Sequence, residues 1–339
     1  MCGIYGIAKT PTPYTKKQLK LASNILREIA IDSETRGSHS SGIAKVGLST
    51  RVYKSLLPSS KFVKTKDFKS ALKSLKDEST ILLGHTRFAT DGAIVKTNAH
   101  PFRIGDVVGA HNGCVYNIEE MKTKLDKQCP VDSQLIFKSI NESDNIQDAV
   151  KYFDSDFALS FVKNNPFVLH LCRESNRPLY VAYIPSLQTL YYASEEGFID
   201  DALDKYNTDG DIFSLNTNTL YSFDVNKFTS LQTNVDKVEF EYESRVYQRP
   251  IYNYVGTTQY NMDDDTDWAT SKKESVDNEA QYLSEIYGGK PEDWFFDDIE
   301  QEWFYLDENN GLILSEEQVA TQQYYDNEEV DYDGYTKNV

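Results

Sequence analysis

The 339-residue sequence is poor in cysteine and contains no long apolar run. Its four cysteines (Cys2, Cys114, Cys129 and Cys172) show no CxxC spacing, so neither a zinc site nor a disulfide framework is indicated. No stretch approaches the roughly 18 apolar residues that a membrane-spanning helix needs. The apolar run GIYGIA is too short for the core of a secretory signal, and Lys9 ends it. We therefore expect a protein of the reducing cytoplasm that has no membrane segment.

Basic residues are scarce in one part of the chain only. Residues 1–225 hold 26 Asp and Glu against 27 Lys and Arg, whereas residues 226–339 hold 27 acids against 8 bases. The formal net charge of −18 therefore belongs to the C-terminal third. This division predicts a globular domain over 1–225 and an acidic tail over 226–339 that is largely disordered or partly docked.

The acidic tail lacks a Gly-rich phosphate loop of the GxxxxGK type. Its charge argues against direct nucleic-acid binding, because phosphate contacts need a basic surface, and would suit a basic protein partner. Aromatic residues stand among the acids at 292–298 (EDWFFDD) and 301–307 (QEWFYLD), which is unusual for plain disorder. We therefore expect part of 276–314 to dock on the domain or on a partner, with a short helix over 276–287.

Periodicity within residues 1–225 predicts an α+β fold. Apolar residues recur at helical spacing over 16–31, and further helices are expected over 67–77, 117–127, 132–141 and 145–153. Strand-like runs occupy 80–85, 107–111, 157–162, 167–172, 179–184 and 190–194. The connections after the third of these runs are short and polar, which favours antiparallel hairpins over parallel crossovers. Helices that cover antiparallel sheets are the expected result.

Cys2 has three readings: a buried thiol, a lipid-attachment site, or a nucleophile that becomes the first residue once Met1 is removed. Without a signal peptide the lipid reading has no export route. A nucleophilic thiol needs a base, and a free α-amino group on the same residue can act as one. Its ordinary pKa of about 7.7–8.0 lies close to working pH.

Other parts of such a site occur in four Gly-containing stretches, RGSHSSGIA (36–44), GHTRFATDG (84–92), TNAHPF (97–102) and GAHNGCVYN (109–117). The side-chain amide of Asn112 and the backbone N–H of Gly113 could meet a developing oxyanion. Arg87 and Asp132 suit the carboxylate and ammonium of an amino-acid substrate. Each has a structural alternative: Arg87 could bridge strands, Asn112-Gly113 could form a hairpin turn, and Asp132 could cap the helix over 132–141.

The elements MCGIYGI, RGxxSSG, GHTRFAT, NAHPF and HNG, in this order, resemble the glutaminase domain of class II glutamine amidotransferases. These enzymes are N-terminal-nucleophile (Ntn) hydrolases, and the similarity is greatest to the glutaminase half of glucosamine phosphate synthase. The resemblance covers about residues 2–225. It implies a four-layer αββα sandwich with mainly antiparallel sheets, preceding the acidic tail, and it implies no cofactor and no metal.

The resemblance also implies roles for individual residues. Cys2 matches the nucleophile, and Asn112 and Gly113 match the oxyanion hole. The positions that match the substrate-binding residues are Arg87, Phe88, Thr90, Asp91, His100 and Asp132. L-Glutamine would be attacked at its side-chain amide, giving a thioester that water hydrolyses to glutamate and releasing ammonia for a separate synthase subunit.

Three positions depart from the nearest relatives. Phe88 stands in place of Trp, Asp91 in place of His, and His39 in place of Asp. Two alternatives to a glutaminase remain open at this point. One is a non-catalytic Ntn-fold binding protein that acts through its acidic tail. The other is an Ntn hydrolase of a different γ-glutamyl amide, which the changes at Asp91 and His39 would suit.

Overall fold

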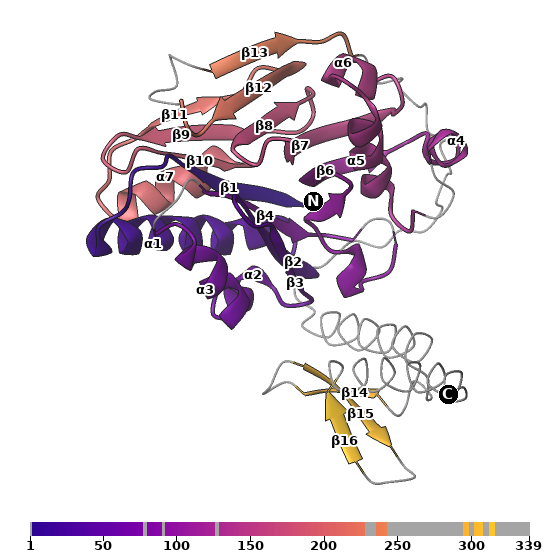
Figure 1. Ribbon diagram of the computed structural model, residues 1–339, viewed down its shortest axis with the longest axis horizontal. Coiled ribbons are helices and arrows are strands. Elements are labelled where there is room, and N and C mark those ends of the chain that lie inside the picture. The colour runs from indigo at the N-terminus through magenta and orange to yellow at the C-terminus, as the bar shows by residue number, and fades with distance from the viewer. Residues whose placement is uncertain are drawn as a thin grey trace, which may run out of the picture. The chain divides into compact units, whose positions relative to one another are not determined.

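The computed structural model describes residues 2–76, 80–89, 92–125, 129–227, 235–242, 294–297, 302–307 and 312–315 (Figure 1). The chain divides into two compact units, Met1–Asn253 and Tyr254–Val339. The first unit contains two large sheets and all of the described helices. None of these helices has both the length and the apolar character needed to cross a bilayer.

The first sheet has seven strands in the order β11-β9-β10-β1-β4-β2-β3, and every neighbouring pair is antiparallel. Strand β1 lies at its centre, between β10 and β4. The bounds of the strands are β1 Gly3–Lys9, β2 Ser40–Val46, β3 Arg51–Ser55, β4 Thr80–Arg87, β9 Tyr180–Ile184, β10 Thr189–Ala193 and β11 Asp211–Ser214.

The second sheet has six strands in the order β13-β12-β8-β7-β6-β5, also antiparallel throughout. Its long central pair, β6 and β7, runs in register from Val107 opposite Lys163 to Val115 opposite Ser155. The bounds of the strands are β5 Phe102–Ile104, β6 Val107–Val115, β7 Ser155–Lys163, β8 Val168–Arg173, β12 Thr219–Asp224 and β13 Val235–Glu239.

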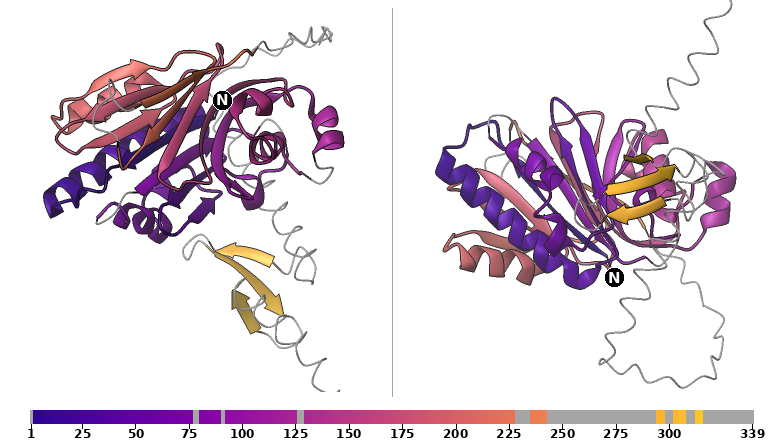
Figure 2. Two further views of the ribbon diagram at one scale, coloured as in Figure 1. Left: turned by 45° about the horizontal axis from the view of Figure 1, so that its top comes forward. Right: turned by 90° about the horizontal axis from the view of Figure 1, so that it is seen from below.

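Helices cover the outer face of each sheet, and the two inner faces pack on each other (Figures 1 and 2). The first sheet is covered by α1 Lys16–Asp32, α2 Ser59–Phe62, α3 Lys66–Lys73 and α7 Glu196–Lys205. The second is covered by α4 Ile118–Lys124, α5 Asp132–Glu142 and α6 Ile146–Ala149. Short 3₁₀ turns occupy η1 Ser33–Arg36 and η2 Lys96–Asn98. The architecture is therefore the predicted four-layer αββα sandwich.

Strand β1 illustrates how alternation produces these layers. Successive strand residues point to opposite faces. Tyr5 and Ile7 join the core under α1 and α7, whereas Ile4 and Ala8 join the core between the sheets. All seven residues of β1 are buried, which explains why the strand reads as one continuous apolar run rather than an alternating one.

The predicted helices correspond to α1, α3, α4, α5 and α6, and the six predicted strands correspond to β4, β6, β7, β8, β9 and β10. The hairpins β7–β8 and β9–β10 are antiparallel, as expected. The connection from β8 to β9 is not a hairpin, because β8 belongs to the six-stranded sheet and β9 to the seven-stranded one. Its short polar loop crosses from one sheet to the other.

The first compact unit continues beyond residue 225, where the charge balance changes. Strand β13 pairs with β12 across five residues, and Phe240 is buried in the core under α5. The Tyr242 hydroxyl donates to the carbonyl of Ser155 and accepts from its N–H, at 2.6 and 2.7 Å. Residues 235–242, although acidic, are therefore packed on the domain.

The second unit contains a three-stranded antiparallel sheet in the order β14-β15-β16. Its strands are Trp294–Asp297, Glu302–Asp307 and Leu312–Ser315. The aromatic segments that stood out among the acids thus fall on β14 and β15. The helix expected over 276–287 lies outside the described residues.

Truncating Phe240 should destabilise the domain although it lies in the acidic region. Phe240→Ala removes a ring that is 5% exposed and packs near Phe157, so we expect the free energy of unfolding to fall by about 3–5 kcal/mol. Val238→Ala, at a side chain 50% exposed, is the control and should stay within about 0.5 kcal/mol of wild type. Urea unfolding of the full chain measures both. Equal, small effects would mean that residues 235–242 add nothing to the fold.

Candidate active site

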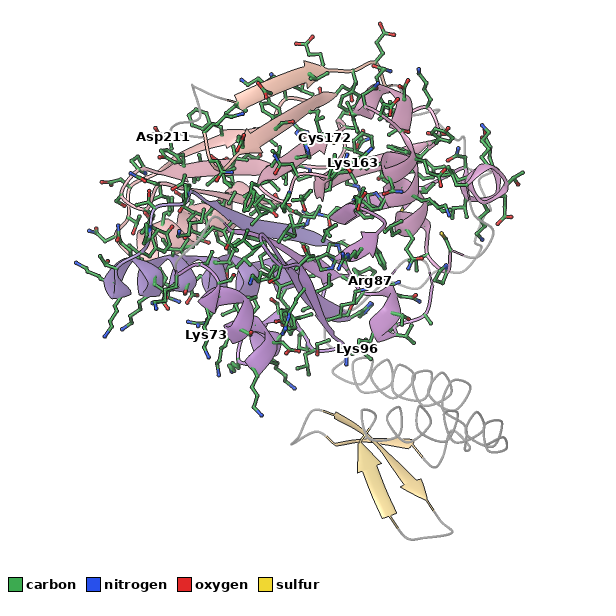
Figure 3. The ribbon with its side chains drawn as sticks, in the orientation of Figure 1. Lys73, Arg87, Lys96, Lys163, Cys172 and Asp211 are labelled. Carbon is green, nitrogen blue, oxygen red and sulfur yellow. The ribbon has the colours of Figure 1, made fainter. Side chains whose placement is uncertain are left out.

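The first residues of β1 lie where the ends of three strands meet. Gly3 stands opposite Thr86 of β4, and Ser40, the first residue of β2, stands opposite Arg87, the last residue of β4. This register brings Cys2, Arg87 and the segment before Ser40 to the same end of the first sheet. Figure 3 labels Arg87 at this place.

The Cys2 sulfur contacts the backbone just after β4. The N–H of Phe88 donates to Cys2 Sγ at 3.2 Å, and the thiol lies 3.4 Å from the carbonyl oxygen of Phe88. Burial raises the pKa of the Cys2 thiol above its ordinary value. The Phe88 hydrogen bond, the positive amino terminus and Arg87 act in the opposite direction on that pKa.

Arg36 holds the main chain of Cys2. Its Nε donates to the carbonyl oxygen of Cys2 at 2.7 Å, and its guanidinium also forms an ion pair with Glu195. The next residue, Gly37, lies so close to the end of β4 that a Cβ there would be 2.5 Å from the carbonyl carbon of Arg87. Sequence reasoning did not single out Arg36, although it opens the RGSHSSGIA stretch.

Asn112 is connected to the strand that follows Cys2. Its Nδ2 donates to Ser194 Oγ at 2.9 Å, and the same hydroxyl accepts from the N–H of Ile4 at 2.8 Å. Asn112 belongs to the second sheet and Ile4 to the first, so Ser194 joins the two sheets at the site. Sequence reasoning also missed Ser194, which follows β10 and lies beside β1 only through the strand pairing.

Asn112 and Gly113 do not form a hairpin turn. Both lie within β6 and pair with Ala158 and Phe157 of β7. Gly113 has φ of +147°, and a Cβ at that position would lie 1.7 Å from the carbonyl oxygen of Asp156. Only glycine fits this conformation and this approach.

Arg87 is buried, and its guanidinium binds the loop that follows β4. Nη1 donates to the carbonyl of Ala93 at 3.0 Å and Nη2 to that of Gly92 at 3.4 Å. Phe88 is 44% exposed, so its ring lies at the surface of the site. Thr90 and Asp91, which were also expected to bind substrate, lie outside the described residues.

Asp132 is the first residue of α5 rather than its N-cap, which is Val131. Its carboxylate accepts from the N–H of Val115 at 3.0 Å and from the N–H of Ser133 at 2.6 Å. The negative charge also lies in the first turn of the helix, where it is favourable. Asp132 therefore fixes the end of β6 against α5, on the strand that carries Asn112.

Three histidines, His85, His100 and His111, are buried in this part of the domain. The rings of His85 and His100 are 4.1 Å apart, and His85 Nε2 lies 3.1 Å from the carbonyl oxygen of His111. Burial lowers the pKa of His85 to about 3, that of His100 well below its ordinary value, and that of His111 as well. All three are neutral at pH 7. Within the described residues no cluster of His, Cys, Asp and Glu is arranged to hold a metal.

A family model described as a glutamine amidotransferase domain matches residues 85–201, which include Arg87, Asn112, Asp132 and Ser194. The chain carries a class II glutamine amidotransferase domain. The four layers, with β1 central in one sheet, are the Ntn-type fold of this class.

Curated proteins similar to this amidotransferase domain include two enzymes named glutamine–fructose-6-phosphate aminotransferase (isomerizing). The one from Acinetobacter baylyi is 28% identical over 164 residues, covering 44% of this chain and 24% of the relative. The one from Gluconobacter oxydans is 34% identical over 126 residues, covering 37% of this chain and 19% of the relative. The chain thus spans about a quarter or less of the length of these relatives.

Solved structures share the fold of the amidotransferase domain. Glutamine phosphoribosylpyrophosphate amidotransferase from B. subtilis aligns with a TM-score of 0.50 and 17% identity, covering 70% of this chain and 49% of that one. A structure described as the allosteric regulatory enzyme of purine biosynthesis aligns with a TM-score of 0.51 and 18% identity, with the same coverage.

Removing the Ser194 hydroxyl should destabilise the amidotransferase domain. Ser194→Ala leaves the N–H of Ile4 and the amide of Asn112 without their acceptor, and each unpaired buried donor costs about 1–3 kcal/mol. Ser139→Ala is the matched control, because that buried hydroxyl only donates to the carbonyl of Ile136 within α5 and orphans no N–H. Urea unfolding should show a clearly larger loss for Ser194→Ala. Equal losses would mean that the hydrogen bonds of Ser194 between the two sheets add nothing measurable to the free energy of unfolding.

Proposed function

We propose that the chain hydrolyses the side-chain amide of L-glutamine through Cys2 once Met1 is removed. The observation that carries this proposal is the surroundings of the Cys2 sulfur: a backbone N–H from Phe88 at 3.2 Å, and the Asn112 amide tied through Ser194 to the strand that follows Cys2. The thiolate attacks the side-chain carbonyl carbon, the C–N bond breaks and ammonia leaves. Water then hydrolyses the γ-glutamyl thioester to glutamate.

The base in this proposal is the α-amino group of Cys2 itself. Burial raises the pKa of the thiol, so a thiolate does not form spontaneously at neutral pH. An amine on the same residue needs no precise placement by another element, and its ordinary pKa of about 7.7–8.0 suits proton transfer. The neighbouring histidines are poor alternatives, because burial lowers the pKa of His85 to about 3.

Asn112 and Gly113 are the proposed donors to the tetrahedral oxyanion. Ser194 accepts one hydrogen of the Asn112 amide, which orients the group and leaves the second hydrogen for the substrate. The backbone of Gly113 has a conformation that no side chain would permit. Preorganised donors of this kind are worth about 10²–10³ in kcat each.

The two ends of glutamine are assigned to Arg87 and Asp132. Arg87 would bind the α-carboxylate and Asp132 the α-ammonium, with Phe88 forming a wall of the site. Thr90, Asp91 and His100 complete the proposed substrate-binding set. Support comes from Arg87, a buried cation beside the sulfur, and from Asp132, a buried acid whose carboxylate is held at the end of β6.

The released ammonia requires an acceptor domain or a separate enzyme. The curated relatives are named glutamine–fructose-6-phosphate aminotransferase, but the chain matches only 24% and 19% of their lengths. We propose a partner synthase as the acceptor, a glutaminase domain that centres on residues 1–225, and a cytoplasmic location. The acidic segment beyond 225 would suit a basic protein partner.

A reactive glutamine analogue should label Cys2 alone. Incubation of the chain with 6-diazo-5-oxo-L-norleucine, followed by intact-protein mass measurement, should show the loss of Met1 and the gain of a single adduct. The reason is that the analogue must be bound as glutamine before the thiolate attacks it. Cys2→Ala should take no adduct, because the other three cysteines lie outside the proposed nucleophile position.

Asn112→Ala supplies the second arm of this test. It should still lose Met1 and bind the analogue, while glutamine hydrolysis falls by about 10²–10³ in kcat, because the lost donor acts in the transition state. A chain that retains Met1, or a processed chain that takes no adduct, would overturn the proposal.

A further inference from the structure

His39 contacts three consecutive residues at the end of β4. Its backbone N–H donates to the carbonyl of Arg87 at 3.0 Å. Its ring stacks on that of Phe88, with the centroids 4.7 Å apart and the planes at 25°. Its Nδ1 accepts from the N–H of Ala89 at 3.0 Å.

The segment that His39 holds is the one that contacts the Cys2 sulfur. Phe88 donates its N–H to Sγ, and this donor stabilises negative charge on the sulfur. The Phe88 N–H belongs to the same peptide unit as the Arg87 carbonyl, and the next unit carries the Ala89 N–H, so the direction of the Phe88 N–H depends on how these two groups are held. His39 binds both of these groups.

We propose that His39 is a positioning residue that aims the Phe88 N–H at the sulfur of Cys2. The inference rests on the proposed function, because it takes Cys2 as the nucleophile, but it assigns His39 no contact with substrate and no proton transfer. It also gives a role to His39, one of the positions that depart from the family pattern: the ring supplies an acceptor for Ala89 together with a stacking surface for Phe88.

The contact with Ala89 requires the neutral imidazole. A protonated Nδ1 carries a hydrogen and would face the Ala89 N–H as a second donor, so the hydrogen bond would be lost. Burial lowers the pKa of His39, and the positive charges of Arg87 and of the amino terminus lower it further. The Cys2 thiol, whose pKa is raised, adds no negative charge at neutral pH. His39 is therefore neutral at pH 7, and the contact is lost as the pH falls through the lowered pKa.

The test measures how fast iodoacetamide alkylates Cys2 in the full chain between pH 4.5 and 8. His39→Asn is the decisive variant, because the Asn side-chain oxygen can accept from Ala89 but does not titrate. The wild-type rate divided by the His39→Asn rate should be constant near pH 8. Below the pKa of His39 this ratio should fall by up to about tenfold per pH unit, because only the wild type loses the Phe88 donor. The loss of thiolate with falling pH is common to both proteins and cancels in the ratio.

His170→Asn is the matched control. His170 also stacks on a phenylalanine, Phe161, at 25°, and its Nδ1 also forms a hydrogen bond, to Ser222 Oγ, but it lies on β8 of the second sheet. This variant should reproduce the wild-type profile. Alkylation of the fully buried Cys172 reports unfolding in the same experiment, so a variant that loses its fold is recognised directly.

A wild-type to His39→Asn ratio that stays the same across the pH range would overturn the proposal. So would a His170→Asn profile that changes as much as that of His39→Asn. Iodoacetamide does not need the glutamine site, so a failure of this test can be told apart from a failure of the proposed function. A chain that takes no glutamine analogue could still show the pH-dependent ratio, and an active glutaminase could lack it.

Discussion

The site depends on the burial of β1 on both of its faces. Tyr5 and Ile7 pack against the outer helices, while Ile4 and Ala8 pack between the sheets. A shift of one residue would exchange these two sets, so the register of the strand is strongly specified. Gly6 tightens this constraint, because a Cβ there would lie 2.3 Å from the carbonyl oxygen of Leu82. With the strand fixed, the residue that precedes it has little freedom of position.

From this fixed strand the site is assembled through main-chain contacts. Arg36 binds the carbonyl of Cys2, Phe88 donates its N–H to the sulfur, and Ser194 accepts the N–H of Ile4 together with the amide of Asn112. Each contact comes from a different segment, and Asn112 comes from the other sheet. The packing of one sheet on the other therefore sets the position of the Asn112 amide, the proposed oxyanion donor, relative to the thiol.

Sequence reasoning succeeded where one element determines its own pattern. Helix α1 shows the apolar spacing of a half-buried helix, and its N-terminal capping box of Thr15 and Gln18 is local. It failed where the path of a connection depends on which sheet each strand joins. The short loop between β8 and β9 crosses between sheets, and no local signal distinguishes that path from a hairpin. Strand β13 is largely exposed and rich in charge, so its apolar pattern is weak. Ser194 was missed for a related reason, since only the pairing of β10 with β1 brings it to the site.

The electrostatics of the site follow from this packing. His85, His100 and His111 are buried in this part of the domain, and burial lowers the pKa of each, so they add polarity without adding charge at pH 7. The nearby positive charges are Arg87 and the amino terminus, and both favour an anion at the Cys2 sulfur. Lys54 responds to the same environment, because burial and Arg87 lower its pKa to about 8. Burial of the thiol opposes its ionisation, so the proposed mechanism needs a separate base. Under the proposal that Met1 is removed, the α-amino group of Cys2 meets that need, because burial lowers the pKa of the nearby histidines too far for them to act as bases at neutral pH.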